Sequence, residues 1–257
     1  MAWRGKILGF GQDAKTIKSN SVKCPDTGKY FAQAINYMAP ADLSGGATLC
    51  PMAEEAGCKD ACLNWSGNGR YNSVQQSRLN KALWFKADPE SFMSALTNDI
   101  SRFTHWCEKR DFVPVIRLNG TTDIRFENVR PLVFFGLNIF EMHPNTHFLD
   151  YTKLVNRTKR PLPKNYHLTW SYSEASNVYA SKLHNVLKAG LNAAVVFSGG
   201  LPDTFKGYPC INGDNHDLRL PWIDGKGVIV GLSPKGHKWK QFDNGFIIHN
   251  EKGAAHA

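Results

Sequence analysis

The chain has 257 residues, of which 42% are hydrophobic and 21% are charged. This composition is typical of a globular protein and excludes an intrinsically disordered one. The net charge of +9 favours contact with anions, including nucleic acid, although the basic residues are scattered along the chain. The apolar runs are too short to cross a bilayer, and no signal-peptide pattern follows Met1. We therefore expect a cytoplasmic protein with no membrane partner.

The first half of the chain predicts an arm, a strand, a loop and two helices. Residues 1–29 are polar and basic, as in an arm or edge segment, and residues 30–37 have the pattern of a strand. A loop rich in Gly and Pro covers 39–69. Helices are predicted over 72–86 and 88–109, the second with Asp88 as N-cap and Pro89 in its first turn.

The second half alternates between strands and helices. Strand-like runs lie at 113–118, 147–151, 167–171, 193–197 and 227–232, and helices are predicted over 126–141 and 173–188, the second closed by Gly190. Such alternation is typical of parallel βαβ units. We expect one α/β domain over 1–257, a partial or complete TIM-like β/α barrel with a Cys-containing loop after its first strand. A doubly wound open sheet is the alternative, and in both cases the site lies at the carboxyl ends of the strands.

Three of the six cysteines fall within thirteen residues: Cys50, Cys58 and Cys62, with the spacing C-x7-C-x3-C. Disulfides are not expected in a chain without a secretion signal, whereas thiolates bind soft metals. Zinc loops usually contain two pairs of ligands, each pair separated by two to four residues. Only the gap between Cys58 and Cys62 has such a length. Wider, unequal spacing suits a [4Fe-4S] cluster. We therefore predict that residues 39–69 form a metal-binding loop for this cluster, with Zn2+ or three separate thiols as the alternatives.

Other cysteines and histidines are weaker candidates. Cys210 follows the 193–197 strand, so it could reach the same face as a fourth metal ligand, and His216 lies in the polar loop after it. Cys24 is a further alternative. Cys107 lies on the apolar face of the second helix and is most simply a packing residue. His237 reads as an ordinary surface histidine.

A polar segment, 119–123, follows the buried strand 113–118. We predict that Asn119, Gly120 and Asp123 contact a cofactor, because a glycine lets the backbone approach a ligand and a carboxylate accepts from an amine or hydroxyl. The alternative is a turn that caps the next helix. The sequence contains no Walker A motif, no HExxH and no serine triad order, so it assigns no catalytic residue.

The cysteine loop, followed by Arg70-Tyr71 and Arg78-Leu79-Asn80, resembles the phage-encoded gene product 88 proteins, and the likeness covers roughly residues 10–240. The segment 118–124 and the late Gly231-Leu232-Ser233-Pro234-Lys235-Gly236 are similar to that group as well. The resemblance implies a bacteriophage (viral) origin, the cytoplasm of an infected bacterial host, and cluster binding through the Cys loop.

A weaker resemblance is to radical S-adenosylmethionine enzymes, which also place three cluster-binding cysteines after the first strand of a β/α barrel. The spacing departs from their usual C-x3-C-x2-C. In that comparison, the segment 119–123 is where the methionine part of S-adenosylmethionine would be held.

The leading hypothesis is an iron–sulfur protein for electron transfer or cluster-based chemistry, with a redox partner or a small molecule as its counterpart. One alternative is a radical S-adenosylmethionine-like enzyme. The other is a zinc-stabilised protein that binds nucleic acid through its basic surface.

Overall fold

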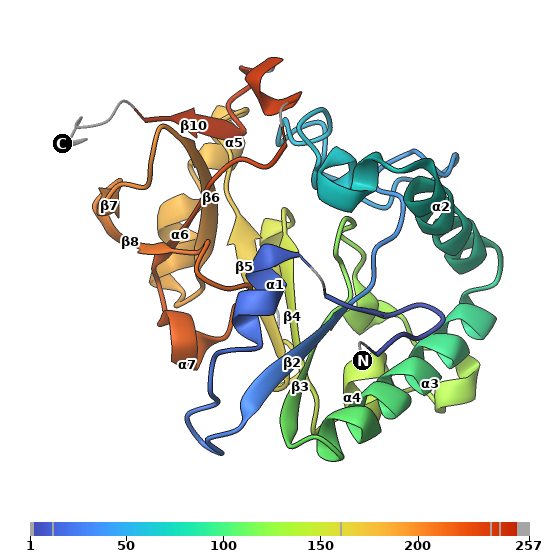
Figure 1. Ribbon diagram of the computed structural model, residues 1–257. Helices are drawn as coiled ribbons and strands as arrows, with labels where there is room; N and C mark the ends of the chain where they lie inside the picture. The colour runs from blue at the N-terminus through green and yellow to red at the C-terminus, as the bar shows by residue number, and fades with distance from the viewer. Residues whose placement is uncertain (1–2, 12, 160, 237, 242, 251–257) are drawn as a thin grey trace.

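The computed structural model describes residues 3–11, 13–159, 161–236, 238–241 and 243–250. Its centre is a mostly parallel sheet of ten strands in the described residues, in the order β1-β2-β3-β4-β5-β6-β9-β8-β7, with β10 beside β6 (Figure 1). The end strands β1 and β7 are antiparallel to their neighbours. The order has two ends, so the sheet is open. The strands are β1 (Gly9–Phe10), β2 (Tyr30–Ile35), β3 (Phe112–Arg117), β4 (His147–Thr152), β5 (Tyr166–Ser171), β6 (Ala193–Ser198), β7 (Thr204–Phe205), β8 (Tyr208–Asn212), β9 (Ile229–Leu232) and β10 (Ile247–His249).

The central strands are buried on both faces, as parallel strands usually are. Residues 31–35 of β2 are all buried. On one face, Ala34 and Ile116 belong to a core shared with the neighbouring helices, whereas Phe31 and Val115 belong to a smaller cluster with Leu218. The six strands expected from the sequence are confirmed, with ends that differ by at most two residues.

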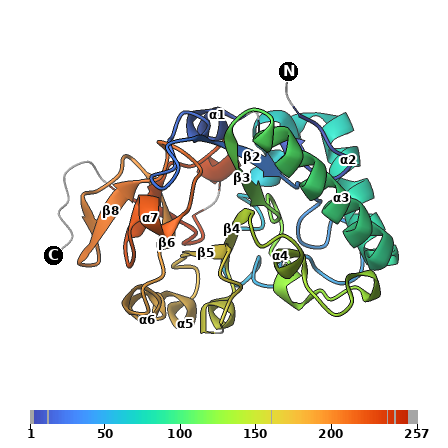
Figure 2. The ribbon, with the colours of Figure 1, turned by 90° about the horizontal axis from the view of Figure 1, so that it is seen from below.

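Two long helices cover one side of the sheet. They are α2 (Asn72–Ala87) and α3 (Pro89–Glu108), which lie beside β2 and β3 (Figure 2). The predicted cap is confirmed, because the Asp88 carboxylate accepts a hydrogen bond from the Ser91 backbone N–H at 3.0 Å. The predicted apolar face is confirmed too, since Phe92, Leu96 and Phe103 are fully buried.

The helix predicted over 126–141 is wrong. The structure has two 3-10 turns, η3 (Phe126–Asn128) and η4 (Leu132–Phe134), and a short helix α4 (Ile139–Met142). Pro131 has no N–H to donate and its ring disfavours a continuous helix. Phe135 and Gly136 have positive φ, and Asn138 starts a new helix with a capping box.

The helix predicted over 173–188 is divided into α5 (Asn177–Ala180) and α6 (Leu183–Lys188). Ser173 does not start a helix, because its hydroxyl donates to the Ala56 carbonyl at 2.8 Å. Ser176 caps α5 instead. The predicted stop is confirmed: Gly190 has φ +80° directly after α6.

Short elements complete the described chain. In those residues, no helix is both long and apolar enough to cross a membrane. The remaining elements are α1 (Ala14–Ser19), η1 (Leu63–Trp65), η2 (Gly67–Arg70), η5 (Val155–Lys159), α7 (Pro221–Asp224) and η6 (Lys238–Gln241).

Candidate metal centre at the carboxyl edge of the sheet

A cavity of about 1240 Å³ lies where the parallel strands end. Its wall includes residues at or just after the ends of four neighbouring strands: Tyr37, Asn119, Lys153 and Ser171. This convergence was expected, because the carboxyl ends of parallel strands meet at one edge. Cys50, Cys58 and Cys62 also line this cavity, which we call the edge cavity.

The cysteine loop is a compact series of turns tied to the sheet at two places. On one side, the Asp123 N–H donates to the Leu49 carbonyl at 2.9 Å. On the other, the Asn244 side chain donates to the Gly57 carbonyl at 2.7 Å, close to the Ser173 bond to Ala56. Because one anchor directly precedes Cys50 and the other directly precedes Cys58, they hold the loop over the edge cavity.

Each of the three sulfurs has at least one polar contact with the protein. Cys50 Sγ is 3.5 Å from the Thr121 carbonyl, Cys58 Sγ is 3.7 Å from the Ala53 carbonyl, and Cys62 Sγ accepts from an N–H at 3.4 Å. The pKa of Cys50 is raised to about 12 and that of Cys62 to about 11, chiefly by burial and to a smaller extent by neighbouring loop cysteines, among them Cys58 in both cases. The thiols of Cys50 and Cys62 are therefore protonated at neutral pH unless a cation displaces their protons.

The three cysteines line the same cavity, but their sulfurs are not arranged as the ligands of a metal ion. Among the residues that the structure describes, no group of three or more His, Cys, Asp or Glu side chains has the arrangement that would hold a metal ion. The described wall of the edge cavity contains three cysteines and no histidine. His237 lies outside the described residues. The sequence prediction of a metal site in the loop stays a prediction.

Cys210, the predicted fourth ligand, is not among the described residues of the cavity wall, although Cys210 and Cys58 pack against the same hydrophobic cluster. Cys210 lies on β8 and pairs with Ile229. The strand order explains the separation, because β9 and four further strands stand between β8 and β2. Cys24 and Cys107 are buried in two different core clusters, as predicted for Cys107.

The segment 119–123 lines the edge cavity, but its polar side chains bind the protein itself. The Asn119 side-chain oxygen accepts from Thr122 and from the Ile124 N–H, and its amide donates to Asp150 at 3.0 Å. The Asp123 carboxylate accepts from Thr152, Lys153 N–H and Arg157, the last at 2.7 Å. No helix follows, so the segment is neither a capping turn nor a loop with free side chains. It supports Cys50.

Close packing around the segment 119–123 leaves no room for a side chain at Gly120. A Cβ at this position would lie 2.7 Å from the Asn36 carbonyl and 2.6 Å from the Tyr37 ring. We expect Gly120→Ala to lower the free energy of unfolding by about 1–3 kcal/mol, because the contact cannot relax without a backbone shift. Urea unfolding measures this. Gly9→Ala is the matched control, since nothing lies within 4 Å of its added Cβ; an equal loss in both variants would contradict the packing argument.

Three cations of the edge cavity were not predicted from the sequence: Arg78, Lys81 and Lys153. Lys153 directly follows β4. The reasoning that selected Asn119, namely that polar residues just after a parallel strand lie at the site, could therefore have selected Lys153 as well. Arg78 and Lys81 lie in the middle of a helix, where the sequence gives no signal that distinguishes them from surface residues. Arg78 and Lys153 line the same cavity wall as the cysteines. Burial lowers the pKa of Lys153 to about 8, and the charge of Cys58 opposes that shift.

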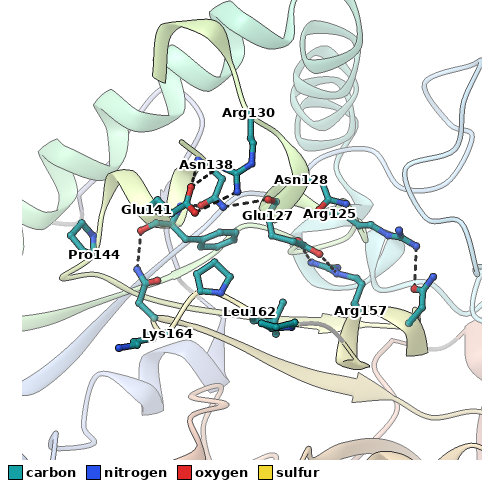
Figure 3. A pocket seen from close by; sticks show the side chains of 15 residues that line it. Arg125, Glu127, Asn128, Arg130, Asn138, Glu141, Pro144, Arg157, Leu162 and Lys164 are labelled. Carbon is teal, nitrogen blue, oxygen red and sulfur yellow. Dashed lines mark hydrogen bonds and ion pairs between the residues drawn. The ribbon is translucent and has the colours of Figure 1, made fainter. Parts of the chain in front are cut away.

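A second, smaller cavity of about 580 Å³ lies around α4 and the segment after β4 (Figure 3). Its charged residues are mostly paired. Arg157 is bonded to Glu127, and Arg130 to Glu141, at 2.8 and 2.9 Å. With its charges satisfied within the protein, this cavity is a weaker candidate for a site than the edge cavity.

Comparison with known proteins gives a family and no activity. No curated protein and no solved structure matches the chain. A family model described as "Gene product 88" matches residues 7–250, nearly the whole length. This match confirms the resemblance seen in the cysteine loop, and the chain belongs to the gene product 88 family.

Proposed function

We propose that Cys50, Cys58 and Cys62 bind a [4Fe-4S] cluster and that the protein uses it for redox or cluster-based chemistry in the infected bacterial host. The observation that supports this most is the sharing of one cavity wall by these three cysteines. The other three are divided between two core clusters and strand β8.

The donor set fits a cluster better than structural zinc. A structural zinc site usually has four Cys or His ligands, and the described wall supplies three cysteines. Three thiolates can hold a cubane cluster with one iron left open for another ligand. Arg78 and Lys153 would offset part of the negative charge of the bound thiolates, a form of tuning common around clusters. When bound, the cluster would supply one-electron transfer.

The edge cavity favours a second candidate, the binding of S-adenosylmethionine at the open iron. The 119–123 segment lies in the same cavity and touches Cys50 through the Thr121 carbonyl. We infer, in addition, that the open sheet is a partial β/α barrel, the setting in which that chemistry occurs. The discriminating observation is a change in the electron paramagnetic resonance spectrum of the reduced protein when S-adenosylmethionine is added.

Metal analysis tests the proposal directly. Protein purified without oxygen should be brown and contain about four iron and four sulfide per chain. Reduction should give a cluster signal in electron paramagnetic resonance. About one zinc per chain, without sulfide, would instead support the zinc-stabilised alternative. In that case, steeply salt-dependent binding to DNA would be the next observation to seek.

A further inference from the structure

Helix α2 presents two cations to the edge cavity without a carboxylate partner. Arg78 and Lys81 are one helical turn apart and both line the cavity. Among the described residues, neither has an Asp or Glu oxygen within 4.0 Å, whereas other cations of the protein do. Burying charge without a counter-charge is costly, so this pair needs an explanation.

Neutral groups hold both cations in place. Arg78 Nη1 donates to the backbone and side-chain oxygens of Asn64, both at 2.8 Å, and its guanidinium lies over the Tyr37 ring. Lys81 Nζ donates to the Ile7 carbonyl at 3.2 Å and to the Asn36 side chain at 3.4 Å. These contacts fix the side chains but do not bring a carboxylate into contact with either cation. Burial, with the charge of Arg78 in second place, lowers the pKa of Lys81 to about 8, and the charge of Asp99 opposes this shift only in part.

Several other cations of the same cavity are paired with carboxylates, although Lys153, in the part of the chain that the structure describes, is not: its Nζ donates to the Tyr172 carbonyl at 3.2 Å. Arg117 Nη1 is 3.0 Å from Asp217, which lies 3.9 Å from Lys15. Lys235 is 3.1 Å from Asp214. Cations beside β3 and α1 are therefore in contact with carboxylates, whereas Arg78 and Lys81 form a pair of neighbouring cations without such a contact among the described residues.

We propose that Arg78 and Lys81 bind the phosphate group of a small phosphorylated molecule. Residues three apart on a helix have Cβ atoms about 5–6 Å apart, which lets both reach one tetrahedral anion. A phosphate monoester carries roughly −1.5 to −2 charges at pH 7, which matches the two cations, whereas a carboxylate carries one. The edge cavity is much larger than a phosphate ion, so it has room for the rest of an ester. Aromatic residues of its wall, among them Phe10 and Tyr37, offer surfaces for an organic group.

Binding to the full-length chain tests this site without relying on the cluster. Adenosine 5′-monophosphate is the ester probe, adenosine lacks the phosphate, and acetate supplies a carboxylate. Titration calorimetry at constant ionic strength should show that the wild type binds the monophosphate at least about tenfold more tightly than adenosine. The same titrations after iron removal by a chelator should give the same preference, so failure of cluster assembly would not affect the result.

Lys81 variants identify the residues involved. Lys81→Met should weaken monophosphate binding about tenfold, and Lys81→Arg should retain it. Lys235→Met is the matched control, because Lys235 lines the same cavity but is paired, and it should leave binding unchanged. Thermal unfolding establishes that each variant is folded. Equal affinity for adenosine and its monophosphate, equal binding of acetate, or full binding by Lys81→Met would each overturn the assignment.

Discussion

Replacing Cys50, Cys58 or Cys62 singly by serine should remove most of the iron and sulfide from anaerobically purified protein. Serine keeps the size of the side chain but not the soft thiolate that iron–sulfur clusters require. Two remaining thiolates leave two irons of a cubane without protein ligands, so we expect loss of the cluster rather than a small change in it. Iron and acid-labile sulfide per chain, with the visible spectrum, measure the effect.

Cys210→Ser is the control for this series. Cys210 is half-buried, as are the loop cysteines, but lies on β8 and is not among the described residues of the edge cavity wall. Iron content in this variant should equal that of the wild type. Loss of iron in Cys210→Ser would make Cys210 the fourth ligand. Full iron content in all three loop variants would end the cluster proposal.

Local patterns in the sequence were enough to predict the main elements of the fold. Strands buried on both faces appear as short apolar runs bounded by turn residues, as in β3 and β6. Asp88, Pro89 and the spacing of Phe92 and Leu96 define α3, because capping and helical periodicity are local effects. Parallel pairing follows from the alternation of strands with connecting segments.

The predictions for the segments that connect the strands were wrong where local sequence signals conflict. The apolar run 132–135 resembles part of a helix, but Pro131 and Gly136 on either side break it into 3-10 turns. Ser173 has the residue type of a helix cap, yet its hydroxyl is taken by a carbonyl of the cysteine loop, 117 residues earlier. A local sequence pattern cannot reveal contacts between residues so far apart in the chain. The late strands β7, β8 and β10 were not predicted for the same reason.

The candidate site was predictable in part. Clustering of the cysteines and the rule for strand ends placed the loop and the 119–123 segment at one cavity, as the structure shows. The roles of individual side chains were not predictable. Asn119 and Asp123 have residue types that suit a ligand, but they bond to Asp150 on β4 and to Arg157 in η5, more than 30 residues later in the chain. Only the folded chain reveals which polar atoms are already paired.

Arg157→Met should be the most destabilising single substitution outside the hydrophobic core. Arg157 is 2% exposed and bridges two carboxylates. It is 2.7 Å from Asp123 and 2.8 Å from Glu127, and Figure 3 shows the pair with Glu127. It also donates to the Tyr166 hydroxyl at 2.8 Å. Its removal leaves the buried Asp123 and the half-buried Glu127 without their cation, which costs about 3–5 kcal/mol of unfolding free energy. Urea unfolding of the metal-free protein measures this loss.

The loss should depend on pH in a definite direction. Burial raises the pKa of Asp123, and the Arg157 charge opposes that rise. Without Arg157 the folded-state pKa rises further above the unfolded value of 3.8, so the folded state binds a proton more readily. The deficit of Arg157→Met should therefore be largest at neutral pH and shrink as pH falls through that raised pKa. A deficit that grows on acidification would contradict this account.

A surface ion pair supplies the matched control. Arg130 and Glu141 are 2.9 Å apart but 46% and 37% exposed, so Arg130→Met should cost only about 0–1 kcal/mol. The two substitutions should differ in their effect on the cysteine loop as well as in the loss of unfolding free energy. Arg157 holds Asp123, whose N–H bonds to Leu49 beside Cys50, whereas Arg130 has no such connection among the described contacts. Arg157→Met should then lower iron content as well as stability, and Arg130→Met should change neither. Equal effects of the two substitutions would show that the Asp123 network does not support the cysteine loop.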